Sequence, residues 1–146
     1  MKQFFSSIIC VLIFLYVCAQ PKEDISKIKF YADYCYGTCP VFEITINNDR
    51  NASYKAIEYN KLEGLFNATI EKPQFDSLLL LISETNLFSL KNGYNTQVTD
   101  LPTYTLTVKL KNGQTKTIID YGPAGPKKLL LVYEKFFLLR ESQAWK

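Results

Sequence analysis

The order of hydrophobic and polar side chains predicts strands in the first half of the chain. From Ile25 to Ala32, the apolar Ile28 and Phe30 alternate with Lys27 and Lys29, and this period of two is typical of a strand with one buried face. Comparable alternation predicts three further strands: Val41 to Ile46, Ala52 to Tyr59, and Leu65 to Ile70. In the second of these, Tyr54, Lys55 and Glu58 are expected on a partly wet face of the sheet.

The period becomes helical after Pro73, a residue well suited to a first helical position. Phe75, Leu78 and Ile82 follow at helical spacing and predict an amphipathic helix over Pro73 to Glu84. A second helix is predicted over Lys127 to Arg140. Its expected buried stripe is Leu129, Val132, Tyr133, Phe136 and Phe137.

A hairpin is predicted between the two helices. Tyr104 to Leu110 alternates, Asn112-Gly113 favours a type I′ turn, and Gln114 to Tyr121 returns. The stretch from Phe88 to Leu101 is expected to be an irregular connection.

These elements predict an α+β fold for residues 20–146, taken as a single domain. The expected order is β-β-β-β-α-β-β-α, in an antiparallel sheet of about six strands with both helices on one face. The other face would be open and rich in Tyr, Thr and Lys.

The first 19 residues are interpreted as a signal peptide. Lys2 precedes an apolar run from Phe4 to Val17, and cleavage is expected after Ala19. The run is shorter than the roughly 20 residues of a spanning helix, so no membrane span is expected after processing. The protein is therefore expected to be exported to the periplasm or outside the cell. As an alternative, the residues before Cys18 loosely resemble a lipobox, which would make Cys18 a lipid anchor.

The composition excludes several classes of function. The 17 basic and 14 acidic residues are spread evenly, and a net charge of +3 does not favour nucleic-acid binding. The chain contains no histidine, which removes Ser-His-Asp and Cys-His nucleophilic sites and histidine metal sites. It also lacks a glycine-rich phosphate loop, so no cofactor is expected.

Cys35 and Cys39 form a C-x₃-C-P motif with Pro40. In an exported protein such a close pair normally forms a disulfide. Four extended steps would separate the two Cα atoms by ~13 Å, whereas a disulfide needs them within ~7 Å. The segment must therefore fold back as a turn. Gly37 can take a positive φ there, and Pro40 opposes a helical continuation.

Three other roles compete with a structural disulfide at this pair. A thioredoxin-like redox site would need C-x-x-C at the start of a helix. The motif also resembles the copper site of Sco-type assembly factors, but those use a distant histidine. A zinc site would need about four N or S ligands. The pair is interpreted as a structural disulfide, with thiol–disulfide exchange as the alternative and no metal.

Two strings carry a resemblance to a known family: Cys35-Tyr36-Gly37-Thr38-Cys39-Pro40-Val41-Phe42 and Thr99-Asp100-Leu101-Pro102-Thr103. They resemble a secreted bacterial family known only as domain of unknown function 6438, over about Ile25 to Lys146. The resemblance implies no activity. It marks as signature positions Cys35, Gly37, Cys39, Pro40, Asp100 and Pro102. Family members often have Asp-Gly after the second strand where this chain has Asp49-Arg50.

The sequence is therefore interpreted as an uncharacterised, non-enzymatic domain of the cell envelope. It would bind or scaffold an envelope protein or a glycan through its open sheet face or its cysteine motif. The alternative is a thiol–disulfide redox protein that uses Cys35 and Cys39. A third hypothesis, carboxylate-based hydrolysis at Asp100, competes with a simple turn-forming role in which that side chain bonds nearby backbone amides.

Overall fold

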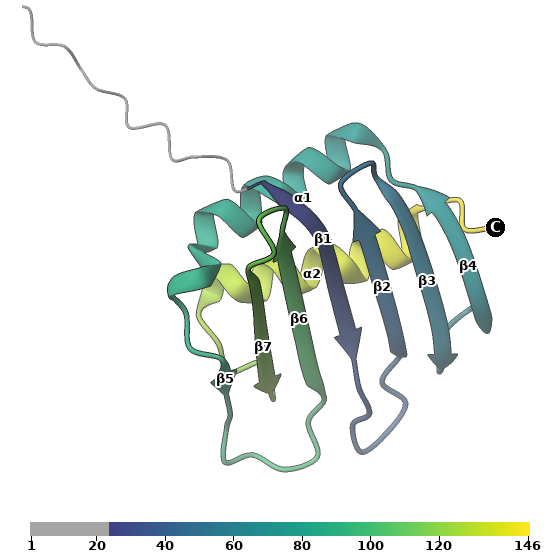
Figure 1. Ribbon diagram of the computed structural model, residues 1–146. Helices are drawn as coiled ribbons and strands as arrows, with labels where there is room; N and C mark the ends of the chain where they lie inside the picture. The colour runs from purple at the N-terminus through teal and green to yellow at the C-terminus, as the bar shows by residue number, and fades with distance from the viewer. Residues whose placement is uncertain (1–23) are drawn as a thin grey trace, which may run out of the picture.

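The computed structural model describes residues 24–146, so the predicted signal peptide and Cys18 lie outside the described residues. Seven strands form one sheet in the order β4-β3-β2-β1-β6-β7-β5, and both helices lie on one of its faces (Figure 1). The strands are β1 (Ile25–Ala32), β2 (Val41–Asn47), β3 (Asn51–Glu58), β4 (Gly64–Thr69), β5 (Gly93–Tyr94), β6 (Thr103–Leu110) and β7 (Thr115–Tyr121). The helices are α1 (Lys72–Thr85), the short 3-10 helix η1 (Leu87–Ser89) and α2 (Lys127–Ser142).

The α+β class is confirmed, with two differences of detail. β1 pairs antiparallel with β2 on one side and with β6 on the other. The extra strand, β5, lies parallel to β7, so the sheet is mixed and has seven strands rather than about six. β5 lies in the stretch from Phe88 to Leu101 that was expected to be irregular. The sequence did not predict it because two residues are too few to produce a periodic pattern.

The core lies between the sheet and the two helices α1 and α2. The ring of Phe30, on β1, stacks on that of Phe136, on α2, with ring centroids 4.9 Å apart. Phe42 and Tyr104, from the two neighbouring strands, pack against the same ring. Of the predicted α2 stripe, Leu129, Val132, Tyr133 and Phe136 are buried and Phe137 is half-buried.

The face opposite the helices, here called the open face, is polar. The cross-strand register aligns Ser53, Thr45, Lys29, Thr107 and Thr117 in one row. The Lys29 ammonium contacts the Glu43 carboxylate at 2.7 Å. Side chains of this kind suit the solvated face of a sheet covered on one side only.

Tyr54 is a correction to the expected wet face of β3. Its side chain is buried on the helix side of the sheet, and its hydroxyl donates to Asn60 Oδ1 at 3.0 Å. The Asn60 side-chain amide in turn donates to the carbonyls of Val41 and Glu58, both at 2.8 Å. A tyrosine can be buried when its one polar group finds such a partner.

The turn between β6 and β7 is a second correction, because it is not of type I′. That turn requires positive φ at both Asn112 and Gly113, and only Gly113 has it, at 92°. The Gly113 amide donates to the Leu110 carbonyl at 3.0 Å, and the Leu110 amide donates to the Gln114 carbonyl at 2.8 Å. The loop therefore has three residues, with Gly113 in the left-handed position that follows a type I turn.

Candidate functional site

Three loops meet at one end of the sheet, which we call the loop end. They are residues 33–40 between β1 and β2, residues 95–102 before β6, and residues 122–126 between β7 and α2. β1 and β7 finish at this end whereas β2 and β6 start there, so all three connections emerge together (Figure 1). Chain topology thus brings most of the residues singled out in the sequence to one region.

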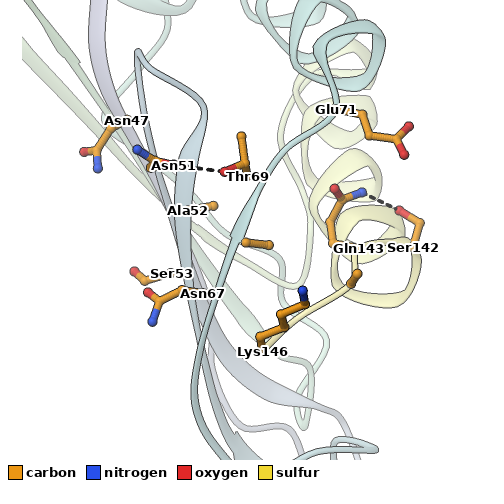
Figure 2. Close-up of a pocket in the computed structure, with 12 residues that line it drawn as sticks. Asn47, Asn51, Ala52, Ser53, Asn67, Thr69, Glu71, Ser142, Gln143 and Lys146 are labelled. Carbon is orange, nitrogen blue, oxygen red and sulfur yellow. Dashed lines mark hydrogen bonds between the residues drawn. The ribbon is translucent and has the colours of Figure 1, made fainter.

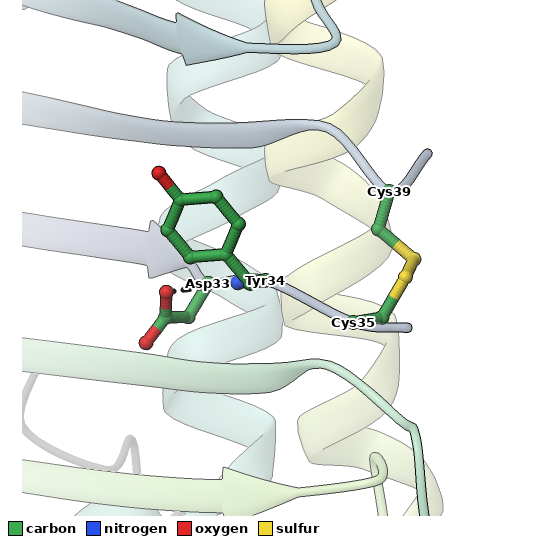
Figure 3. Close-up of a disulfide and its surroundings, with 4 residues drawn as sticks. All are labelled: Asp33, Tyr34, Cys35 and Cys39. Atoms are coloured by element: carbon green, nitrogen blue, oxygen red, sulfur yellow. Dashed lines mark hydrogen bonds between the residues drawn. A yellow bond between two sulfur atoms is a disulfide. The ribbon is translucent and has the colours of Figure 1, made fainter. Parts of the chain in front are cut away.

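The first loop contains the disulfide. Cys35 and Cys39 are bonded, with Cα atoms 5.8 Å apart, so the predicted bridge and the fold-back are confirmed (Figure 3). Gly37 has φ at 145°, and a Cβ placed there would contact only Cys35 Sγ, at 4.0 Å. Backbone conformation rather than crowding therefore favours glycine in this turn.

The disulfide loop is hydrogen-bonded to the second loop. The Tyr36 amide donates to the Asp100 carbonyl at 3.1 Å, and the Asp33 amide donates to the Thr103 carbonyl at 2.9 Å. The two segments that carried the family resemblance are therefore neighbours in space. Asp100 has φ at 68°, and its exposed carboxylate accepts from the Thr99 hydroxyl at 3.1 Å rather than from a backbone amide.

The third loop packs closely on the second. The Gly122 amide donates to the Pro102 carbonyl at 2.9 Å. Gly122 has φ at 70°, and a Cβ there would lie 2.4 Å from Thr96 Cγ2 and 2.7 Å from Leu101 Cδ1. Only glycine fits this contact without a shift of its neighbours, so the two loops hold each other in place.

Asp120, at the end of β7, is the residue of this region that sequence reasoning missed. Its fully buried carboxylate accepts hydrogen bonds from the backbone amides of Ala124, at 2.7 Å, and Gly125, at 3.1 Å. Two tyrosines lie near this carboxylate, Tyr133 and Tyr104. Burial first, and then the Asp120 charge, raises the pKa of both. The signal was present in the sequence, since Asp120 occupies an inward position of an alternating strand.

Three tyrosines stand out from the surface beside these loops. Tyr36 is 87% exposed, Tyr34 is 53% exposed, and Tyr59, which follows β3, is 49% exposed. The Glu58 carboxylate raises the pKa of both Tyr34 and Tyr59, so both phenols lie close to the same acid. We call Tyr34, Tyr36 and Tyr59 the tyrosine surface.

Asp33 fixes the entry to the disulfide loop. Its Oδ1 accepts from the Tyr34 amide at 2.8 Å and from the Tyr31 hydroxyl at 3.0 Å. Partial burial and then the Asp33 carboxylate raise the pKa of Tyr31 to about 12. Asp33 therefore has two donors, and its bond to the Tyr34 amide, drawn in Figure 3, holds the backbone at the start of the loop.

Within residues 24–146, the acids and thiols do not gather into a metal site: no group of three or more could hold an ion. In the same part of the chain, no helix is long and apolar enough to cross a membrane. Of the predicted site residues, Cys35, Gly37, Cys39 and Pro40 form the disulfide loop, and Asp100 and Pro102 lie in the loop bonded to it.

A family model described as "Domain of unknown function (DUF6438)" matches residues 26–140. This range runs from β1 into the last turns of α2 and contains all three loops of the loop end. No curated protein matches the chain.

Proposed function

The chain belongs to the DUF6438 family, whose description assigns no activity, and we propose that it is an exported, non-enzymatic binding domain of the cell envelope whose contact surface is the tyrosine surface. The observation that carries this proposal is the exposure of Tyr34 and Tyr36 on a loop hydrogen-bonded to its neighbour, with the exposed Tyr59 following β3 at the same end of the sheet.

Exposed tyrosines on a fixed support suit recognition. Tyrosine provides a large contact area with few rotatable bonds, so little side-chain entropy is lost when it binds. The disulfide and the Tyr36–Asp100 backbone bond hold the loop before any partner arrives. Such preorganisation reduces the ordering cost of association.

The charges nearby indicate the kind of partner. Glu58 and Asp33 place carboxylates near the Tyr34 phenol, and the exposed Asp100 carboxylate lies in the loop bonded to Tyr36. Rings that stand out from the surface are suited to enter pockets of a protein partner, where tyrosine is a frequent anchor. We therefore favour an envelope protein with basic or hydrogen-bond-donor groups, and a glycan is the second occupant to be tested.

A photo-crosslinking residue in place of Tyr36 tests this proposal in envelope extract. We expect one reproducible crosslinked protein, lost when Tyr34→Ser and Tyr59→Ser are added. The matched control is Leu138→Ser with Leu80→Ser, which removes exposed apolar side chains from the helices. Crosslinks that persist in the serine variant, or no adduct in repeated extracts and on glycan arrays, would count against the tyrosine surface.

A structural role for the disulfide is part of the proposal. Neither cysteine lies at the start of a helix, since β1 ends at Ala32 and β2 begins at Val41. Thiols of redox motifs are usually activated at such a helix start or by a neighbouring cation. We expect the bond to resist glutathione buffers down to roughly −300 mV, whereas reduction near about −200 mV would favour thiol–disulfide exchange. An insulin-reduction assay with Cys39→Ser as control tests the same alternative by activity.

Export is tested by the intact mass of the protein made in its host. A chain that starts at Gln20 supports cleavage after Ala19 and a soluble product. An added lipid mass on Cys18 would instead place the domain on a membrane surface. A mass that begins at Met1 would contradict both forms of export.

A further inference from the structure

Strand β4 is an outer strand of the sheet, and its free edge is partly covered by the last residues of the sequence. The Asn67 amide donates to the Lys146 carbonyl at 2.8 Å, and the Lys146 amide donates to the Asn67 carbonyl at 3.0 Å. Two residues that exchange both backbone bonds form an antiparallel pair. Figure 2 shows Lys146 between Asn67 on one side and the end of α2, marked by Ser142 and Gln143, on the other.

The pairing register shows which groups this edge offers. In an antiparallel strand the backbone groups of successive residues point alternately to the two sides. Asn67 exchanges both backbone bonds with Lys146, and the Ile70 amide donates to the Arg50 carbonyl just before β3, so the odd-numbered residues of β4 direct their backbone groups away from β3. Leu65, Asn67 and Thr69 therefore form the outer row. Lys146 bonds only the middle residue of the three.

The sequence of β4 contains no other protection for the edge. Its residues are Gly-Leu-Phe-Asn-Ala-Thr, with no charge and no proline. Natural proteins protect edge strands with lysine, proline, bulges or a covering segment, and here the covering segment is the device in use. Leu65 is 68% exposed on this strand.

The covering segment, Gln143–Lys146, is attached through Trp145. The Trp145 ring packs on the Tyr54 ring with centroids 5.1 Å apart, and its Nε1 donates to the Arg140 carbonyl at 3.1 Å. The Gln143 side chain also bonds that of Gln74 on α1. Loss of the Trp145 contact should free Lys146 from the edge.

We propose that the outer edge of β4 is a strand-pairing site for a second copy of this chain, and that Gln143–Lys146 keeps it closed. The bond pattern with Lys146 shows that the edge accepts an antiparallel strand. An antiparallel pair centred on Asn67 sets Asn67 against its own counterpart and Leu65 against Thr69, so the edge is self-complementary about a two-fold axis. Because the strand carries no charge, two copies meet without like-charge repulsion.

The test measures the association of the mature chain by light scattering over a concentration series. We expect Trp145→Ala to dimerise at least tenfold more tightly than the wild type. Lys146→Pro, which removes one of the two bonds to Asn67 and leaves the Trp145 ring in place, should act in the same direction and covers the case in which Trp145→Ala fails to fold. Far-UV circular dichroism checks folding of each variant.

Asn67→Pro is the variant that should prevent strand pairing at this edge. It removes the amide that faces outward and leaves the β3–β4 bonds of Phe66 and Ala68, so it should return Trp145→Ala to a monomer. Asn67→Cys in the Trp145→Ala chain should form an intermolecular disulfide, because directly opposed Cα atoms of such a pair lie about 5.5 Å apart. Lys55→Cys on β3 is its control. Folded variants that stay monomeric, or dimers that survive Asn67→Pro, would overturn the proposal.

Discussion

The backbone amide of Tyr36 donates to the carbonyl of Asp100 at 3.1 Å, and this one bond joins the disulfide loop to the loop that precedes β6. The bond lies beside the Asp33–Thr103 bond, which continues the pairing of β1 with β6 past the end of the sheet. The loop end is therefore an extension of the central strands, and its rigidity depends on main-chain contacts as well as on the disulfide.

Replacement of both Cys35 and Cys39 by serine should lower the free energy of unfolding by about 2 kcal/mol, because the bond closes a small ring. The fold should persist, since the core around Phe30 does not include the cysteines. Urea denaturation followed by circular dichroism measures the change, and reduced wild type should agree with the variant. A loss beyond about 4 kcal/mol would make the bond a main source of stability and contradict this estimate.

Gly122→Ala should destabilise the protein by about 2–4 kcal/mol, because the new Cβ combines a positive φ with contacts to Thr96 and Leu101 that are too short. Gly113→Ala is the matched control. Gly113 also has a positive φ, but no atom lies within 4 Å of the added Cβ, so only the backbone cost of about 1 kcal/mol remains. Equal losses in the two variants would show that loop packing at Gly122 contributes nothing.

The sequence predicted those elements whose burial follows a regular period. β1 was predicted with the bounds that it has, Ile25–Ala32, because Ile28, Phe30 and Ala32 are buried on one strand face. The helices were found for the same reason, through Phe75, Leu78 and Ile82 in α1 and the α2 stripe. The turn in the disulfide loop was predicted from a different signal, because two bonded cysteines as close in sequence as Cys35 and Cys39 require the chain to fold back.

Two of the misses, Asp120 and β5, share one physical cause, which is contact between parts of the chain that no local pattern records. Asp120 and Lys116 are charged residues at inward positions of β7. Each binds a neighbouring segment: Asp120 binds the amides of residues 124 and 125, and Lys116 binds the Leu90 carbonyl and Asn92 Oδ1. Asn92 leads into β5, so the seventh strand depends on these bonds rather than on its own residues.

Tyr133→Phe should leave the protein equally stable or more stable by about 1 kcal/mol at neutral pH. The Tyr133 hydroxyl is buried and makes no hydrogen bond of ordinary geometry within the part of the chain that the structure describes. Removing such a group removes a desolvation cost. Tyr54→Phe is the control, because its hydroxyl donates to Asn60, and it should cost about 1 kcal/mol. Thermal melts of the two variants decide the point, and a clear loss in Tyr133→Phe would mean that the Tyr133 hydroxyl donates a hydrogen bond to Asp120.

Stability should fall in alkaline solution because the fold keeps several phenols protonated. Burial raises the pKa of Tyr133 and Tyr104, and burial with Asp33 raises that of Tyr31 to about 12. A tyrosine in the unfolded chain ionises near pH ~10.

Below that value the phenols are protonated in both states and the full stabilisation is present. As pH rises through the window from about 10 to about 12, the unfolded state loses protons first, and each such tyrosine lowers the free energy of unfolding by at most about 1.4 kcal/mol per pH unit. Urea denaturation at about pH 8 and about pH 11 measures the drop, and Tyr133→Phe should make it smaller. Equal stability at the two values would show that the buried phenols do not hold their protons against the solvent.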